Sequence, residues 1–178
     1  GLSSPVNIGI AGGAHLHLGY AGENGGITEN LTFTLDDDMQ GGTFAAADNA
    51  FELSDEQVAS LLDRNIYVNI HTNNFAGGEL RGQLLQEARY YLNAPLSGTS
   101  EVPAVNTPAT GQIVMEVESD SIVSTGAYQD LASPFDPSVA GGSHLHEGLA
   151  GENGGILENL NASAFGDNSG IFASANNT

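Results

Sequence analysis

The sequence contains no cysteine, no tryptophan and no lysine in 178 residues. Without cysteine, the chain cannot form a disulfide, a thiolate metal site or a cysteine nucleophile. Arginine supplies all three basic residues, against 22 acidic ones, so the formal net charge is −19. Nucleic acids and anionic membranes are disfavoured as partners, because both would be repelled by this charge. The balance is typical of a solvated acidic surface.

Long apolar segments are also missing. No run of apolar residues approaches the roughly 20 needed to span a bilayer, so membrane insertion is not expected. The opening residues, GLSSPVNIGIAGG, lack the basic start and long apolar core of a signal peptide. The chain has instead 24 glycines, few charged residues at 14% and a hydrophobic fraction of 40%. This composition is typical of an all-β protein with many turns and a buried core.

One motif of the chain occurs twice. The sequence GGAHLHLGYAGENGGI at 12–27 returns as GGSHLHEGLAGENGGI at 141–156, which is 129 positions later. A second match joins 41–49 to 169–177 at an offset of 128. Because a period of this length is the size of a domain, the two copies belong to two successive domains.

The repeat also predicts how these domains are divided. Residues 1–88 are expected to form the C-terminal part of a first unit, and residues 89–178 the N-terminal part of a second. The first unit then lacks its opening strands and the second lacks its closing ones. Two explanations are open: the sequence is a window on a longer tandem array, or the missing strands come from a neighbouring chain.

Alternating polar and apolar residues predict most of the secondary structure. The expected strands lie at 30–35, 42–46, 67–72, 79–84, 113–118 and 122–128. A single helix is expected after Ser54, an N-cap residue that is followed by Asp55 and Glu56 in the first turn. Short strands with one short helix predict an all-β fold, an immunoglobulin-like or Greek-key β-sandwich.

Four of the five histidines belong to the repeated His-Leu-His motif. In a strand, residues i and i+2 point to the same face, so His15 and His17 would project together. The fifth, His71, lies in the expected strand 67–72, and three imidazoles would converge if that strand lies beside the motif. Three neutral nitrogens with an open position suit copper or zinc. The alternative is a set of hydrogen-bonded histidines with no metal. The candidate metal ligands are His15, His17, His71, His144 and His146.

Other motifs carry weaker signals. The AGENGG segment after the first motif predicts a tight loop, in which Glu23 or Asn24 could orient a ligand histidine. Asp36-Asp37-Asp38 lacks the ligand spacing of an EF-hand loop, so calcium is only a weak alternative cofactor. The sequence shows no Ser-His-Asp triad, phosphate-binding loop or dinucleotide fingerprint, and no catalytic residue is predicted.

Four segments together resemble the CHRD (chordin-type) domain family. They are AHLHLGYAGENGGI (14–27), LSDEQVASLL (53–62), YVNIHTNNFAGGELRGQL (67–84) and YLNAPLSGTSEVPAVNTPATGQIVMEV (91–117). The resemblance implies an extracellular β-sandwich module, often in tandem copies, without a settled activity. The histidine motif of the family is carried here by His15, His17 and His71, and in the second unit by His144 and His146. The second unit has no YVNIHT strand in this sequence, which leaves its metal site incomplete.

Three functions follow as hypotheses, in order of preference. The first is an extracellular or cell-surface structural protein that binds copper or zinc and assembles with copies of itself into a filament or array by strand complementation. The second is a soluble copper- or zinc-binding module. The third is a copper enzyme similar to superoxide dismutase, which would need redox cycling at an open coordination position.

Overall fold

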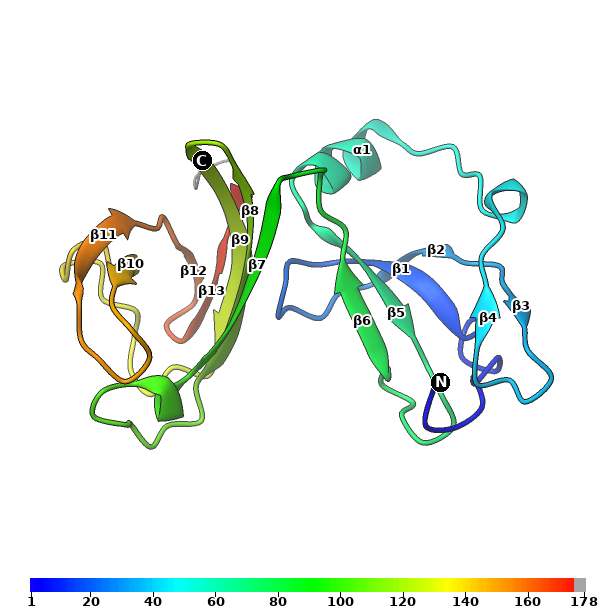
Figure 1. Ribbon diagram of the computed structural model, residues 1–178, viewed down its shortest axis with the longest axis horizontal. Helices are drawn as coiled ribbons and strands as arrows, with labels where there is room; N and C mark the ends of the chain where they lie inside the picture. The colour runs from blue at the N-terminus through cyan, green and yellow to red at the C-terminus, as the bar shows by residue number, and fades with distance from the viewer. Residues whose placement is uncertain (175–178) are drawn as a thin grey trace. The chain divides into compact units, whose positions relative to one another are not determined.

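The computed structural model describes residues 1–174, which form mainly antiparallel β-sheet in two compact units (Figure 1). Unit 1 comprises Gly1–Gly19 and Asn24–Leu84, and unit 2 comprises Tyr20–Glu23 and the chain from Leu85 onward. The predicted all-β sandwich with one short α-helix is confirmed. No helix in residues 1–174 is long and apolar enough to cross a membrane.

Unit 1 is built on a four-stranded sheet with the strand order β2-β1-β5-β6. Its strands are β1 (Ala14–Leu18), β2 (Ile27–Asn30), β5 (Ile66–Ile70) and β6 (Leu80–Gln83). A separate small hairpin joins β3 (Thr34–Leu35) to β4 (Gly42–Thr43), and a short 3-10 helix follows at Ala46–Asp48. All pairs are antiparallel, and β1 lies in the middle of the sheet between β2 and β5.

The strands of unit 1 are shorter than the alternation predicts. The expected strand 30–35 is interrupted, because the side chain of Asn49 bonds both backbone groups of Thr32, at 2.9 Å from its N and 2.7 Å from its O. The expected strand 67–72 ends at Ile70. Its partner β1 begins at Ala14, and Gly13 before it has a φ of +91°, so the ladder stops where β1 leaves the sheet.

The single α-helix of the described chain, α1 (Asp55–Leu62), begins where the sequence predicts it. The Oγ of Ser54 accepts a hydrogen bond from the N of Gln57, and the Oε1 of Gln57 accepts one from the N of Ser54. This capping box satisfies two backbone donors that the first turn leaves without partners. Leu61 of the helix lines one pocket with Leu16 and Ile66, so α1 covers the sheet face that carries Leu16. The histidines of β1 alternate with Leu16 and point to the opposite face.

Unit 2 contains a five-stranded sheet with the order β12-β13-β9-β8-β7 and a two-stranded hairpin. The sheet strands are β7 (Tyr90–Ser97), β8 (Thr110–Glu118), β9 (Ser121–Gln129), β12 (Ser163–Phe165) and β13 (Ser169–Phe172). The hairpin consists of β10 (His144–Glu147) and β11 (Gly155–Asn159), and a 3-10 helix lies at Gly98–Ser100. The predicted hairpin of 113–118 with 122–128 is confirmed as β8–β9, with both strands longer than expected.

A small core lies between the sheet and the hairpin of unit 2, which face each other (Figure 1). Its buried members are Ile113, Met115, Tyr128, Leu160 and Phe172. Leu145 of β10 packs against this cluster, so the hairpin turns its apolar face inward and its histidine face outward. Unit 2 is therefore a two-layer sandwich with a narrow second layer.

The two units contain equivalent parts with different partners. β10–β11 repeats β1–β2, including the irregular register between Leu16 and His17 that recurs between Leu145 and His146. β12–β13 in turn repeats β3–β4. In unit 1 the hairpin β1–β2 gains β5 and β6, whereas in unit 2 the hairpin β12–β13 gains β9, β8 and β7. Each unit therefore has one extended sheet whose counterpart in the other unit is only a two-stranded hairpin.

Candidate metal centre

The pairing of β1 with β5 brings three histidines together. His15 lies opposite Asn69 and His17 opposite Tyr67, and both side chains lie on one face of the sheet. His71 follows β5 directly, and its backbone N donates a hydrogen bond to the O of Gly13 at 2.8 Å. The ring centroid of His15 lies 4.8 Å from that of His17 and 4.5 Å from that of His71, as the sequence hypothesis required.

Two of these rings have a fixed orientation and a defined tautomer. The Nδ1 of His17 lies 2.8 Å from the O of Gly25, and the Nδ1 of His71 lies 2.8 Å from the O of Ala76. A carbonyl oxygen can only accept, so each Nδ1 carries the proton and donates it. The lone pair of each ring is then on Nε2, and both Nε2 atoms are buried without a hydrogen-bond partner among the described residues.

The third ring offers its other nitrogen. The Nδ1 of His15 is buried and has no hydrogen-bond partner in the described chain, and the side chain is only 1% exposed. Burial, followed by the charge of His71, lowers the pKa of His15, and a hydrogen bond to the backbone of Ala11 opposes this only in part. The lowered pKa keeps the ring neutral near pH 7, which is the form that can bind a metal ion.

These nitrogens form a set with the composition of a metal site. The candidate ligand atoms of His15, His17 and His71 all lie within 4.8 Å of one another, and the three side chains are buried. A metal at about 2.0–2.1 Å from each nitrogen would hold them about 3.3 Å apart, so the rings need to close by about 1.5 Å at most. Within residues 1–174 this is the one group of three such side chains that could hold an ion. Three imidazoles with an open fourth position fit zinc or copper.

Tyr67 supports the site and was missed by the sequence reasoning. Its ring stacks on His17 with a centroid distance of 4.8 Å and an interplanar angle of 4°, and its hydroxyl accepts a hydrogen bond from the N of Gly25 at 3.2 Å. The guanidinium carbon of Arg81 lies 3.4 Å from the centroid of the same ring. The signal was present, because Tyr67 precedes His71 by four positions and thus shares its strand face. Only the register, which places Tyr67 opposite His17, turns that into a contact.

The loop after β1 orients His17 through its backbone, which corrects the hypothesis that Glu23 or Asn24 does so. The side chain of Glu23 accepts from the N of Tyr20, and that of Asn24 accepts from Arg81. The carbonyl oxygen of Gly25 accepts the hydrogen bond from the Nδ1–H of His17. A Cβ on Gly25 would overlap the carbonyl oxygen of Leu18, so glycine is required at this position.

The second His-Leu-His motif has the same local geometry without a third histidine in its unit. The ring centroids of His144 and His146 are 4.7 Å apart with an interplanar angle of 59°, against 4.8 Å and 56° for His15 and His17. The Nδ1 of His146 lies 2.9 Å from the O of Gly154. The Nδ1 of His144 is buried with no partner in the described chain. Unit 2 thus has counterparts of two of the three candidate ligands in the same arrangement, in a more exposed setting.

The acidic triplet has a local role. The N of Met39 donates to the O of Asp36, and the N of Gln40 donates to the Oδ1 of Asp38 at 2.9 Å. These bonds make a turn between β3 and β4. The residues that the structure describes contain no cluster of three carboxylates close enough to hold a cation.

Comparison with known families identifies the repeated domain. The CHRD domain family matches residues 1–84 and, a second time, residues 92–176. No curated protein and no solved structure matches the chain. The two matches fall on the two copies of the histidine motif. The chain therefore belongs to the CHRD domain family, with two copies in tandem.

Proposed function

We propose that the chain is an extracellular structural repeat protein that binds copper or zinc through His15, His17 and His71 and assembles with copies of itself through free strand edges. The observation that carries the metal binding is the set of three buried imidazole nitrogens without hydrogen-bond partners. Leaving such groups unsatisfied costs about 1–3 kcal/mol each. A metal ion would satisfy all three at once. The extracellular location is proposed from the resemblance to the CHRD family.

The metal would cross-link distant parts of the chain in a protein without disulfides. His15 and His17 belong to β1, whereas His71 follows β5, and these residues are separated by more than 50 positions in the sequence. An ion bound to all three would close this long loop, and its binding free energy would add to the stability of the folded state. A bound metal would therefore serve the mechanical role that disulfides have in many extracellular modules.

Elemental analysis of protein purified without chelator tests the metal site. We expect copper or zinc at about one ion per chain in the wild type and its loss in His71→Ala. The matched control is His144→Ala, which removes a histidine outside the three and should keep the ion. Absence of metal from the wild type, or equal content in His71→Ala, would contradict the proposal and leave the histidines as structural residues.

Assembly is supported by the strand edges of both units. The four-stranded sheet ends in β2 and β6, and the five-stranded sheet ends in β12 and β7. Edges of this kind are templates for pairing with another chain. Apolar side chains near them remain exposed, such as Leu80 at 52% and Leu92 at 51%. A second copy could cover such side chains.

Light scattering at increasing protein concentration tests the assembly. We expect a mean mass that grows with concentration in the presence of copper or zinc, because pairing between edges is a bimolecular step. Variants with a charged residue on an edge strand, such as Leu92→Lys in β7, should lower this growth. A chain that binds the metal and stays monomeric throughout would favour the soluble metal-binding module.

A further inference from the structure

One edge of unit 2 is free where its counterpart in unit 1 binds a strand. β1 pairs with β2 and β5, whereas β10 pairs with β11 alone among residues 1–174. We propose that the free edge of β10 binds a segment of the β5–β6 type from another CHRD repeat, and that a histidine of this segment, in the place of His71, completes a second metal site with His144 and His146. This inference rests on the proposed metal binding at the first site.

The backbone before β10 already has the conformation that receives β5 in unit 1. The three residues before β1 have φ values of +44°, +83° and +91°, and their counterparts in unit 2, which end one residue before β10, have +48°, +82° and +86°. They are Ala11, Gly12 and Gly13 in unit 1, and Ala140, Gly141 and Gly142 in unit 2. In unit 1 the O of Gly13 accepts a hydrogen bond from the N of His71. The corresponding carbonyl in unit 2, that of Gly142, is therefore placed for the same bond.

The loop further upstream holds the end of the strand in unit 1. The N of Asn73 donates to the O of Pro5 at 3.0 Å. The N of Asn74 donates to the Oγ of Ser4, also at 3.0 Å. Val6 forms an isolated bridge with Thr72. The end of β5 and the residues after it are thus bound by the loop at residues 4–6 as well as by β1.

The counterpart loop in unit 2 has the same hydroxyl and carbonyl groups, but they are exposed to solvent. Ser4-Pro5 recurs as Ser133-Pro134, with the same hydroxyl and the same carbonyl. Ser4 is 7% exposed in unit 1, whereas Ser133 and Pro134 are both exposed in unit 2. This difference in exposure is expected if no strand covers the loop in unit 2.

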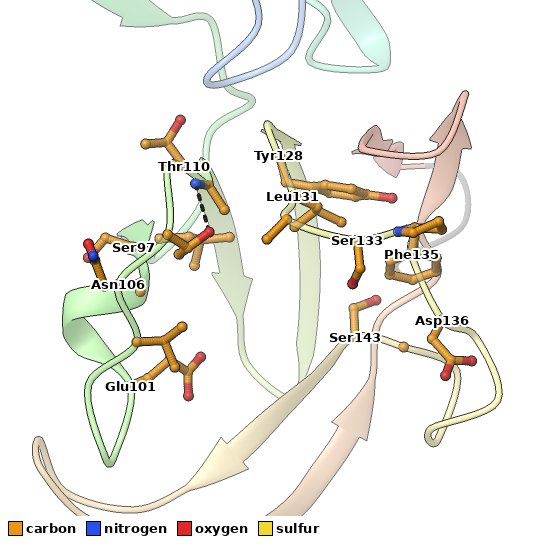
Figure 2. Close-up of a pocket in the computed structure, with 18 of the residues that line it drawn as sticks. Ser97, Glu101, Asn106, Thr110, Tyr128, Leu131, Ser133, Phe135, Asp136 and Ser143 are labelled. Atoms are coloured by element: carbon orange, nitrogen blue, oxygen red, sulfur yellow. Dashed lines mark hydrogen bonds between the residues drawn. The ribbon is translucent and has the colours of Figure 1, made fainter.

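A pocket of about 620 Å³ lies beside this loop, lined by Leu131, Phe135 and Ser143 among others. Figure 2 shows these three residues on one side and Ser97 and Thr110 across from them.

The counterparts of two pocket residues show what the pocket lacks. Leu2 and Val6, the counterparts of Leu131 and Phe135, line a smaller pocket in unit 1 together with Ile70 of β5 and Leu80 of β6. Ile70 and Leu80 thus form a wall in unit 1 that has no counterpart in unit 2. The core-facing side chains of a β5–β6 segment would supply that wall and bury apolar surface, at about 25 cal/mol per Å².

The opposite face of the same segment would carry the metal ligand. With β1 as the template, residues at the positions of Asn69 and Tyr67 would lie opposite His144 and His146. A histidine at the position of His71 would then approach the Nδ1 of His144, which is buried and has no partner in the described chain. Strand pairing, apolar burial and metal binding would all favour the same segment in the same register.

The donor segment has to be additional to the one that the chain carries. The chain has two copies of the receiving hairpin, β1–β2 and β10–β11, but one β5–β6 segment, which is paired with β1. Moving that segment to β10 would empty the first site and satisfy no further edge. A repeat that presents an unpaired β5–β6 segment is therefore the partner that fits this free edge.

The full chain with an added peptide of residues 64–84 provides the test. Zinc is the probe, because it has no redox chemistry, and bound zinc per chain is measured after unbound ion and peptide are removed. We expect about one zinc without the peptide and about two with it. A peptide with His71→Ala should add no zinc, and the chain variant His146→Ala should keep the first zinc and lose the second.

A longer chain guards against a peptide that fails to fold. Since 169–177 repeats 41–49, Thr178 stands at the position of Ala50, and a copy of residues 51–84 placed after it continues the repeat in phase. This extended chain should bind two zinc ions, and the same extension with the histidine equivalent to His71 replaced by alanine should bind one.

The outcomes separate the two proposals. One zinc in every sample, including the extended chain, would overturn the second site and support the first. No zinc in any sample would overturn the proposed metal binding and this inference with it. Two zinc ions in the chain alone would show that His144 and His146 need no donor strand, which would also overturn the inference.

Discussion

The Nδ1 of His17 lies 2.8 Å from the carbonyl oxygen of Gly25, and this contact fixes which nitrogen of the ring is left for a metal. The loop between β1 and β2 thereby acts on the site without contributing a ligand. The equivalent contact in unit 2, between His146 and Gly154 at 2.9 Å, shows that the motif carries its own orienting group. Outer contacts of this kind set the tautomer and the direction of a metal-binding histidine.

Gly25→Ala should weaken metal binding with little change elsewhere. A Cβ at this position would overlap the carbonyl oxygen of Leu18, so the loop must open and the bond to His17 is lost. Loss of such an orienting contact typically costs 10–100-fold in metal affinity. Isothermal titration with zinc measures the change. Gly26→Ala is the matched control, since a Cβ there meets nothing within 4 Å, and equal losses in both variants would contradict the assignment.

Tyr67 is expected to stabilise unit 1 through two separable contacts. Tyr67→Phe keeps the ring stacked on His17 but removes the hydroxyl that accepts from Gly25, which should cost about 1 kcal/mol of the free energy of unfolding. Tyr67→Leu also removes the ring that stacks on His17 and lies under Arg81, for about 0.5–1.5 kcal/mol more from the stack alone. Urea unfolding measures both. Tyr90→Phe, at a ring that is 54% exposed, should change little.

The metal-free protein should become less stable as the pH falls below about 6.5. The pKa of His15 is lowered in the folded state, mainly by burial, so below about pH 6.5 the unfolded chain takes up a proton more readily than the folded one. The stabilisation from the neutral ring is fully present above that pH and is lost as the pH falls toward the folded-state pKa.

Urea midpoints at about pH 7.5 and about pH 5.5 measure this effect. His15→Gln cannot titrate at this position, so its midpoint should fall less between the two values. An identical fall in both proteins would show that other groups cause it. With zinc bound, the same protons compete with the ion for the ligand nitrogens, so zinc should be released over the same range.

The sequence predicts well those features that depend on neighbouring residues. Alternation predicted the β8–β9 hairpin, and the cap at Ser54 predicted the start of α1. The convergence of His15, His17 and His71 needed one further assumption, that the two histidine-bearing segments are adjacent. The repeat supported this only indirectly, because it reveals which parts are equivalent and not which strands pair.

What the sequence could not predict depends on contacts between distant residues. The interruption of 30–35 results from Asn49, which is 17 positions away from Thr32 and bonds its backbone in place of a strand. The pattern of alternation contains no trace of that contact. The role of Tyr67 depends on the register of β5 against β1, and a shift of one residue would have placed its ring on the other face.

Association between copies should strengthen as salt is added. Each chain has a formal charge of −19, so two copies repel each other over a distance set by the Debye length, which is about 30 Å at 0.01 M salt and about 3 Å at 1 M. Pairing of strand edges and burial of apolar side chains act at contact, and salt does not screen them. Light scattering at about 0.01 M and about 0.5 M sodium chloride, at fixed zinc and protein concentration, should therefore give the larger mass at the higher salt.

The edge variant Leu92→Lys is the control, because it should stay smaller than the wild type at both concentrations although it reduces the negative charge. A mass that falls with salt would mean that contacts between opposite charges hold the copies together, which would contradict assembly through strand edges.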